Sequence, residues 1–178
     1  HGYIREHGQE QYVRDARIAQ IYEGTNGIQA LDLVGRKMPD GAGRLLRRFF
    51  HPVSEYIAAK IEDDAMGEFV QPLAKAFVRL QQATAQIARV GMARPDEAGA
   101  ASVDYLRLFG LTALAYLWCR EAEVAQAKIA AGAGDVFFEG KIATARFFME
   151  RLLPDTGARF SAIMAGGKSM MAFPDEAF

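Results

Sequence analysis

One segment, residues 14–29, combines an acidic side chain with a glycine-rich helix start. Apolar residues at three- and four-residue intervals predict a helix over residues 9–22, and Glu23 follows its end. A second helix is expected to start at Asn26, whose side chain can cap backbone N–H groups. Since the first N–H groups of a helix lack partners within it, this corner could bind an anion such as a phosphate-bearing ligand. The alternative is that Thr25 and Asn26 only cap the helix while Glu23 lies in solvent.

Two further patterns resemble ligand sites without completing them. Residues 165–169 read Ala-Gly-Gly-Lys-Ser, but a phosphate-binding loop would require glycine at position 162, where the chain has Ala162. No strand is expected before this motif either. The three histidines, His1, His7 and His51, lack the spacing of metal ligands, so no metal site is expected.

Composition narrows the classes of partner. The 21 basic and 22 acidic residues nearly cancel, so neither nucleic acid nor an anionic membrane is an expected partner. The most apolar stretch, residues 106–119, is too short to span a bilayer, which takes roughly 20 residues. A single cysteine, Cys119, excludes an internal disulfide and reads as a small buried hydrophobe. With nothing resembling a signal peptide, a cytoplasmic protein is expected.

The apolar periodicity predicts an all-α chain, because alanine is abundant and alternating β-branched runs are almost absent. Pro39-Asp40-Gly41 should break the chain after the second helix. Beyond that break, the simplest fold is an antiparallel bundle of four long helices. These helices are expected at residues 43–63, 68–92, 96–131 and 138–153, with a short helical piece at 160–164.

The chemistry-bearing segment resembles a known signature. Tyr-Glu-Gly-Thr-Asn-Gly-Ile-Gln at residues 22–29, preceded by Arg-Asp-Ala-Arg-Ile at 14–18, closely resembles the acyl-CoA dehydrogenase signature near the end of the catalytic helical domain. His-Gly-Tyr-Ile at 1–4 is similar to the later half of the Gly-Gly-x-Gly-Tyr element that precedes it in the family. The match continues through 30–37 toward the subgroup with an additional C-terminal helical domain. That subgroup includes the 3-methylthiopropanoyl-CoA dehydrogenases.

The resemblance implies a role for each signature residue. Glu23 occupies the position of the catalytic base, which removes the α-proton of an acyl-CoA thioester while the β-hydrogen leaves as hydride to FAD. Desolvation by substrate raises the pKa of such a glutamate toward its working range. Gly24 matches a substrate contact, and Thr25, Asn26 and Gly27 match positions that touch FAD. Because Gly27 replaces a longer polar residue of some relatives, any contact there must come from the backbone.

The resemblance also implies how the chain is organised. Residues 1–38 would be the last two helices of a catalytic helical domain, and residues 39–178 a C-terminal helical-bundle extension. The chain is then expected to be part of a longer protein, inactive alone because most of the flavin pocket is missing. Implied partners are an acyl-CoA substrate, an electron acceptor that the residues do not specify, and further copies in a homo-oligomer. The alternative is a non-catalytic helical module for oligomerisation or nucleic-acid interaction that retains the signature.

Self-association is expected for a physical reason as well. Ile18, Ile21, Leu31 and Val34 would lose their packing partners without an upstream domain, and exposed apolar patches tend to associate.

Overall fold

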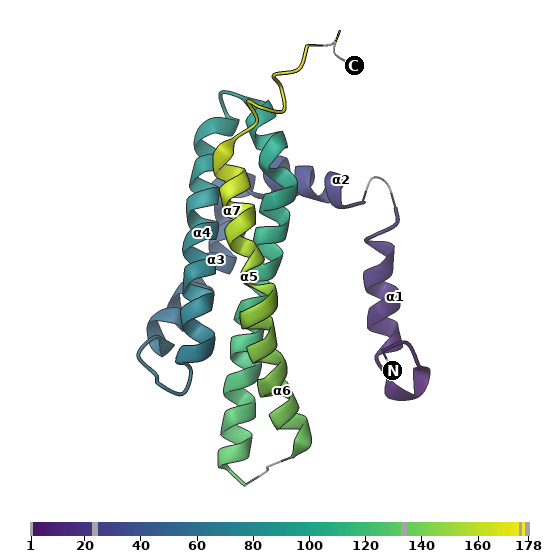
Figure 1. Ribbon diagram of the computed structural model, residues 1–178, viewed down its shortest axis with the longest axis vertical. Helices are drawn as coiled ribbons and strands as arrows, with labels where there is room; N and C mark the ends of the chain where they lie inside the picture. The colour runs from purple at the N-terminus through teal and green to yellow at the C-terminus, as the bar shows by residue number, and fades with distance from the viewer. Residues whose placement is uncertain (1, 23–24, 133–134, 175, 177–178) are drawn as a thin grey trace.

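The computed structural model describes residues 2–22, 25–132, 135–174 and 176, and no strand occurs among them. Figure 1 shows an elongated group of helices with a separate arm at the N-terminal side. The predicted all-α fold is therefore confirmed.

Four long helices form the elongated body. They are α3 (Asp40–Lys60), α4 (Gly67–Gly91), α5 (Pro95–Ala130) and α6 (Val136–Phe147). A π-helical turn, η3 (Phe148–Leu152), extends α6, and α7 (Asp155–Ala165) follows it. Helices α4, α6 and α7 all pack along α5, and α3 packs against α4. The predicted antiparallel bundle is confirmed, with α7 as an additional full helix.

The N-terminal part forms an arm that contacts the bundle through α2 and the helical turn that follows it. It contains η1 (Arg5–His7), α1 (Glu10–Ile18), α2 (Thr25–Asp32) and the π-helical η2 (Leu33–Lys37). Both α2 and η2 contact α5, whereas Figure 1 shows α1 standing beside the bundle. Of the two helices that flank Glu23, the second is thus docked on the bundle.

Local sequence explains where the bundle helices begin. Helix α5 starts with Pro95, whose missing N–H is not needed in a first turn, followed by Asp96 and Glu97 near the positive end of the helix dipole. At α6 the carboxylate of Asp135 accepts a hydrogen bond from the backbone N–H of Phe137 at 3.2 Å.

Several predicted helix ends were wrong. The first helix ends at Ile18 rather than at residue 22, and α1 buries no residue that would hold a further turn. Asn26 lies inside α2 instead of at its cap, because the helix already begins at Thr25. The short piece expected at 160–164 is a helix that starts directly after Pro154, since proline is tolerated at a helix start.

The expected break after Pro39 is confirmed, and it lies at Gly41, Ala42 and Gly43. All three have positive φ, between 54° and 77°. Two glycines adopt this left-handed conformation at little cost, and they leave Ala42 as the one strained residue between them. The chain therefore turns sharply between η2 and the rest of α3.

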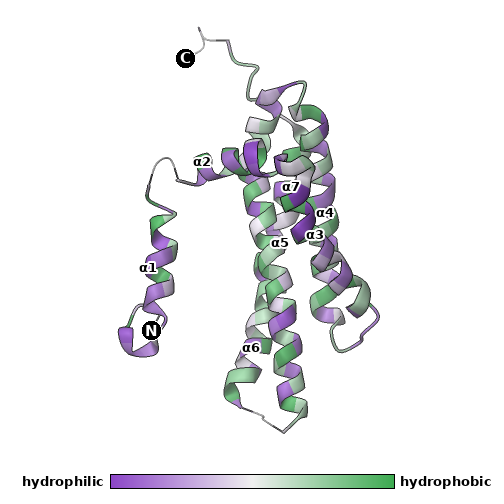
Figure 2. Ribbon diagram, turned by 180° about the vertical axis from the view of Figure 1, so that it is seen from behind, coloured by the Kyte–Doolittle hydropathy of each residue, from purple (hydrophilic) through white to green (hydrophobic). Residues whose placement is uncertain are grey.

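The core consists of two clusters along the bundle. One contains Phe69, Leu73 and Phe148, and the other contains Leu80 and Leu108. Figure 2 shows hydrophobic positions spread over all the bundle helices. Cys119 lies in the first cluster, as expected, where its thiol donates to the carbonyl of Phe69 at 3.4 Å and burial raises its pKa to about 12.

Ion pairs tie α7 to α5. The guanidinium of Arg107 bonds Asp155 at 2.9 Å, and Arg159 bonds Asp104 at 3.0 Å. Hydrogen bonds from Arg107 and then Arg159 lower the pKa of the Asp155 carboxyl. Among the described residues, no helix is both long and apolar enough to cross a membrane.

Candidate functional site

The predicted base and substrate contact, Glu23 and Gly24, lie outside the described residues. The residues on either side of them are held together, because the backbone N–H of Thr25 donates to the carbonyl of Tyr22 at 2.9 Å. Tyr22 follows α1 along the chain, and Thr25 is the first residue of α2, the helix that Figure 1 shows reaching from the arm to the bundle.

Thr25 has an unusual backbone conformation. Its φ is 49°, which is uncommon for a β-branched residue and is found mostly where surrounding structure imposes it. Thr25 is half-buried, whereas Asn26 beside it is exposed. A polar, exposed first turn suits contact with a ligand outside this chain.

Gly27 leaves the first turn of α2 open. A Cβ atom added there would meet no heavy atom within 4 Å. The backbone at Gly27 is therefore accessible, and N–H groups at a helix start favour an anion. These residues fit a phosphate-bearing cofactor as one wall of a site.

Helix α2 is positioned from its C-terminal side. Ala30 and Val34 are buried in the contact with the bundle. Asp32 accepts two hydrogen bonds from Arg36, at 2.5 and 2.8 Å, and pairs with Lys37 at 3.1 Å. The bonds from Arg36, followed by those from Lys37, lower the pKa of Asp32 to about 2. Asp32 therefore holds its own helix end and is not a candidate proton donor.

Arg14 and Asp15, which belong to the signature, make contacts within α1. Arg14 pairs with Glu10 and lies 5.0 Å from the ring centroid of Tyr3. Asp15 accepts a hydrogen bond from Gln11 at 2.8 Å. Both residues have the structural roles that their helical spacing indicates.

The glycine pair before Lys168 is engaged by the protein itself. The backbone N–H of Gly167 donates to the carboxylate of Glu97 at 2.8 Å. A carboxylate here occupies the position that a phosphate would need. Both the incomplete motif and this contact therefore indicate that residues 165–169 do not form a phosphate-binding loop.

Sequence reasoning missed an apolar groove next to η2, of about 600 Å³. We call it the η2 groove. Its walls come from four segments: the continuous end of α2 with η2, the first turns of α3, the end of α4 and the start of α5. They include Leu31, Val34, Met38, Leu46, Ile87 and Ala98. No motif could have found it, because these residues are distant in sequence; clustered small residues near helix ends were the one available signal.

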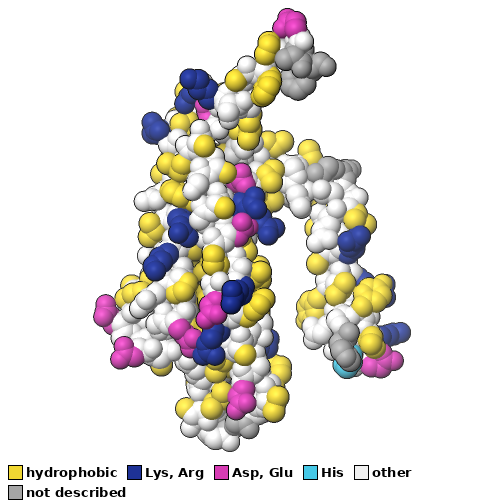
Figure 3. All heavy atoms as spheres, viewed as in Figure 1, with side chains coloured by type: hydrophobic (Ala, Val, Ile, Leu, Met, Phe, Trp, Pro, Cys, Tyr) yellow, Lys and Arg dark blue, Asp and Glu magenta, His cyan; other side chains and the backbone are white. Residues whose placement is uncertain are grey.

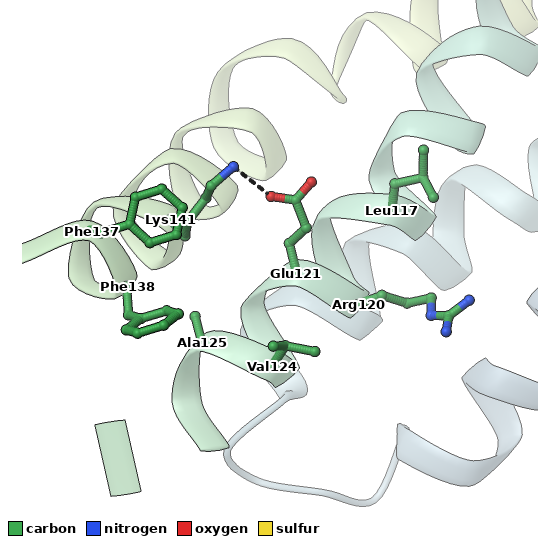
Figure 4. A pocket seen from close by; sticks show the side chains of 8 residues that line it. All are labelled: Leu117, Arg120, Glu121, Val124, Ala125, Phe137, Phe138 and Lys141. Carbon is green, nitrogen blue, oxygen red and sulfur yellow. Dashed lines mark hydrogen bonds and ion pairs between the residues drawn. The ribbon is translucent and has the colours of Figure 1, made fainter. Parts of the chain in front are cut away.

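A second groove, of about 480 Å³, lies between α5 and the start of α6 (Figure 4). Figure 4 shows Lys141 reaching from α6 to Glu121 on α5, where their ion pair is 2.9 Å long. The Lys141 ammonium also lies 5.5 Å from the ring centroids of Trp118 and Phe137. Lys141 and Glu121 therefore join two helices rather than being left free for chemistry, and Arg120 bonds the Tyr116 hydroxyl within α5 at 3.4 Å.

The fold and site together define a class of protein. A bundle of long helices is joined through α2 and η2 to an N-terminal arm, and the first turn of α2 is open at Gly27. The described chain is thus an all-α protein in which a helical arm precedes a helical bundle.

Comparisons with known proteins place the chain in a family. Residues 49–174 match the family model "Acetyl-CoA dehydrogenase C-terminal like", and residues 1–38 match "Acyl-CoA dehydrogenase, C-terminal domain". The chain therefore belongs to the acyl-CoA dehydrogenase family, as its signature indicated.

Three curated relatives illustrate the range of the family. A 3-methylmercaptopropionyl-CoA dehydrogenase of Ruegeria pomeroyi is 37% identical over 96% of this chain and 29% of its own length. A broad-specificity linear acyl-CoA dehydrogenase of Mycobacterium tuberculosis is 32% identical over 99% of this chain and 30% of its own length. A butyryl-CoA dehydrogenase of Syntrophomonas wolfei is 26% identical over the full chain and 30% of its own length. The chain thus spans less than a third of the length of these relatives.

Proposed function

We propose that this chain is the C-terminal part of a flavin-dependent acyl-CoA dehydrogenase that converts an acyl-CoA into a trans-2-enoyl-CoA. The observation that carries the proposal is the pair of family matches, at residues 1–38 and 49–174, with the signature around Glu23 inside the first. We divide the chain accordingly into the end of a catalytic helical domain, residues 1–38, and an appended bundle, residues 39–178.

In this proposal the residues of the arm do three things. The Glu23 carboxylate removes the α-proton of the thioester, and its backbone N–H donates to the thioester carbonyl, which stabilises the enolate-like charge. Gly24 lets the acyl group approach because it has no side chain. Thr25, Asn26 and Gly27 hold the phosphate-bearing part of FAD through the first turn of α2. Bound FAD supplies the acceptor for the β-hydride.

The test is Glu23→Gln in the complete enzyme, mixed with acyl-CoA in a single turnover while flavin bleaching is followed. Glutamine keeps size and hydrogen bonding but cannot take a proton, so flavin reduction should slow by roughly 100- to 10,000-fold. Substrate and FAD binding should persist. Near-normal bleaching would exclude Glu23 as the base. Asp15→Asn is a matched control because the Asp15 carboxylate accepts its hydrogen bond from Gln11 within α1.

The isolated chain of 178 residues should show neither flavin colour nor turnover, because Thr25, Asn26 and Gly27 supply one wall of the site. Tight FAD binding by this chain alone would contradict that expectation. Absorbance of the purified protein near the flavin bands checks it directly.

For the substrate, we propose 3-methylthiopropanoyl-CoA. Support comes from the name of the 37%-identical relative, a 3-methylmercaptopropionyl-CoA dehydrogenase, and from the similarity of residues 30–37 to that subgroup. The relatives named for butyryl-CoA and for linear acyl-CoA define the competitors. A comparison of kcat/KM for the complete enzyme with these thioesters decides the matter, and a preference for butyryl-CoA would reject the sulfur-containing substrate.

A further inference from the structure

We propose that the η2 groove binds the alkyl chain of a fatty carboxylate, with the carboxylate held at the mouth by Arg44 and Arg47. This site is separate from the corner at Glu23, and the proposal does not rest on the function proposed above.

The size of the η2 groove suits a chain-like ligand. Its volume of about 600 Å³ lies within the usual range of small-molecule sites, about 300–1,000 Å³. Four of the described lining residues are glycines, Gly35, Gly43, Gly91 and Gly99, and they add no side chain to the walls. Gly35 lines the groove, and a Cβ atom added there would meet no heavy atom within 4 Å, so a larger side chain has room at this position.

The interior of the groove offers no side chain for a polar ligand. Its one polar lining side chain is Thr84, and the remaining lining residues are aliphatic, Met, Pro or Gly. The Thr84 hydroxyl is already used, because it donates to the carbonyl of Leu80 at 2.7 Å and lies 2.7 Å from the hydroxyl of Tyr105. An occupant of the interior must therefore be apolar.

Two arginines, Arg44 and Arg47, lie on the part of α3 that borders the groove at Ala42 and Gly43. Ala42, which lines the groove, accepts a hydrogen bond from Arg47 Nη1 at 2.6 Å, and the side chain of Arg44 lies against Gly41. Neither guanidinium forms an ion pair with a carboxylate among the described residues. The opposing charge on the same turn is Asp40, at the start of α3.

Charge and shape together select the ligand class. Between residues 31 and 48 the chain has five basic and two acidic side chains, so an anion is favoured over a cation at this mouth. A guanidinium binds a carboxylate through parallel N–H donors. An apolar channel that ends at such groups fits an alkyl chain with a terminal carboxylate.

Calorimetric titration of the chain with octanoate, decanoate, dodecanoate and tetradecanoate, each below its micelle concentration, tests the proposal. Each buried methylene should lower Kd by about fourfold until the groove is full, after which Kd stays constant. The heat capacity change should be negative. Affinity that does not depend on chain length would overturn the proposal.

Matched variants separate the groove from the rest of the surface. Gly35→Leu fills the groove and should weaken dodecanoate binding by roughly tenfold or more. Gly110→Leu is the control, since Gly110 lies on α5 outside the groove and its added Cβ also meets nothing within 4 Å. Equal losses in both variants, with unchanged circular dichroism, would reject the groove as the site.

The role of the mouth is tested by the headgroup. The double variant Arg44→Ala/Arg47→Ala should weaken dodecanoate binding by roughly tenfold while leaving dodecanol binding unchanged. An equal loss of affinity for dodecanoate and for dodecanol would show that these arginines do not bind the carboxylate. Binding to phosphatidylglycerol vesicles that Gly35→Leu does not reduce, without binding of free dodecanoate, would instead indicate a membrane surface and overturn it.

Discussion

At the residue scale, the buried hydroxyl pair Thr84–Tyr105 is the polar interaction that joins α4 to α5 inside the core. The Thr84 hydrogen is committed to the carbonyl of Leu80, so Tyr105 is the donor between the two hydroxyls. Tyr105 has no exposed surface, and among the described residues its hydroxyl has one side-chain partner, Thr84. Removing the Thr84 hydroxyl leaves Tyr105 without an acceptor, whereas removing the Tyr105 hydroxyl leaves Thr84 bonded to Leu80.

Thr84→Val should cost more stability than Tyr105→Phe. The valine variant leaves the Tyr105 hydroxyl buried without an acceptor, at about 1–3 kcal/mol, whereas the phenylalanine variant leaves Thr84 bonded to Leu80, at about 0.5–1.5 kcal/mol. The double variant should lose less than the sum of the two. Urea unfolding of the four proteins measures these differences, and additive losses would show that the hydroxyls are not coupled.

Tyr105 should also make stability fall at alkaline pH. Burial raises its pKa to about 12 in the folded chain, from 10.0 when free, so the folded state keeps the proton that the unfolded state releases. This stability is fully present below pH 10.0 and is lost as pH rises to about 12, by roughly 2–3 kcal/mol. Tyr105→Phe should show a smaller fall over this window, and unfolding curves at about pH 9 and about pH 12, below and at the end of the window, would compare the two proteins. An equal loss of stability with pH in the parent chain and in Tyr105→Phe would contradict the assignment of this pH dependence to Tyr105.

At the element scale, the long helices could be predicted because each repeats its apolar residues every three or four positions. The predicted ranges 68–92 and 96–131 differ from α4 and α5 by a single residue at each end. The helix ends that were predicted wrongly depend on contacts between helices, or on a proline that a helix start tolerates. Within α3, Pro52 lies in helical backbone, while the non-helical residues are Gly41, Ala42 and Gly43.

The C-terminal end of α7 depends on one glycine. Gly166 has φ 74° and ψ −177°, a conformation that is almost restricted to glycine, and an added Cβ would lie 2.7 Å from Glu97 Oε2. Gly166→Ala should therefore cost about 1–3 kcal/mol and weaken the bond from Gly167 to Glu97. Thermal unfolding measures the loss.

The control for that variant is Gly140→Ala, on the exposed side of α6, where an added Cβ meets nothing within 4 Å. Alanine has the higher helix propensity, so this change should stabilise by about 0.5–1 kcal/mol. If Gly166→Ala were equally stabilising, the contact with Glu97 would not hold the segment after α7.

At the scale of the whole molecule, the signature and the groove show what a sequence can reveal. The predicted site residues are contiguous, from Glu23 to Gly27, so order and spacing were enough to single them out. The η2 groove is formed by four segments that meet only after folding, and no local pattern specifies it. The burial of Val34 was missed for the same reason: it is 8% exposed because η2 docks on α5, although exposure was predicted.

The remaining members of that predicted patch stay exposed on the arm. Ile18, Ile21 and Leu31 are 54%, 59% and 51% exposed, and Figure 3 shows hydrophobic side chains on the surface of both the arm and the bundle. We expect the chain to form dimers or larger assemblies at micromolar concentrations, because association removes this apolar surface from water. Ile18→Glu/Ile21→Glu should weaken association by roughly tenfold or more, since it places charges in the contact. Val78→Glu, a change at an exposed valine on α4, is the control and should leave it unchanged. Light scattering over a dilution series measures both, and a strictly monomeric parent chain would reject the arm as an association surface.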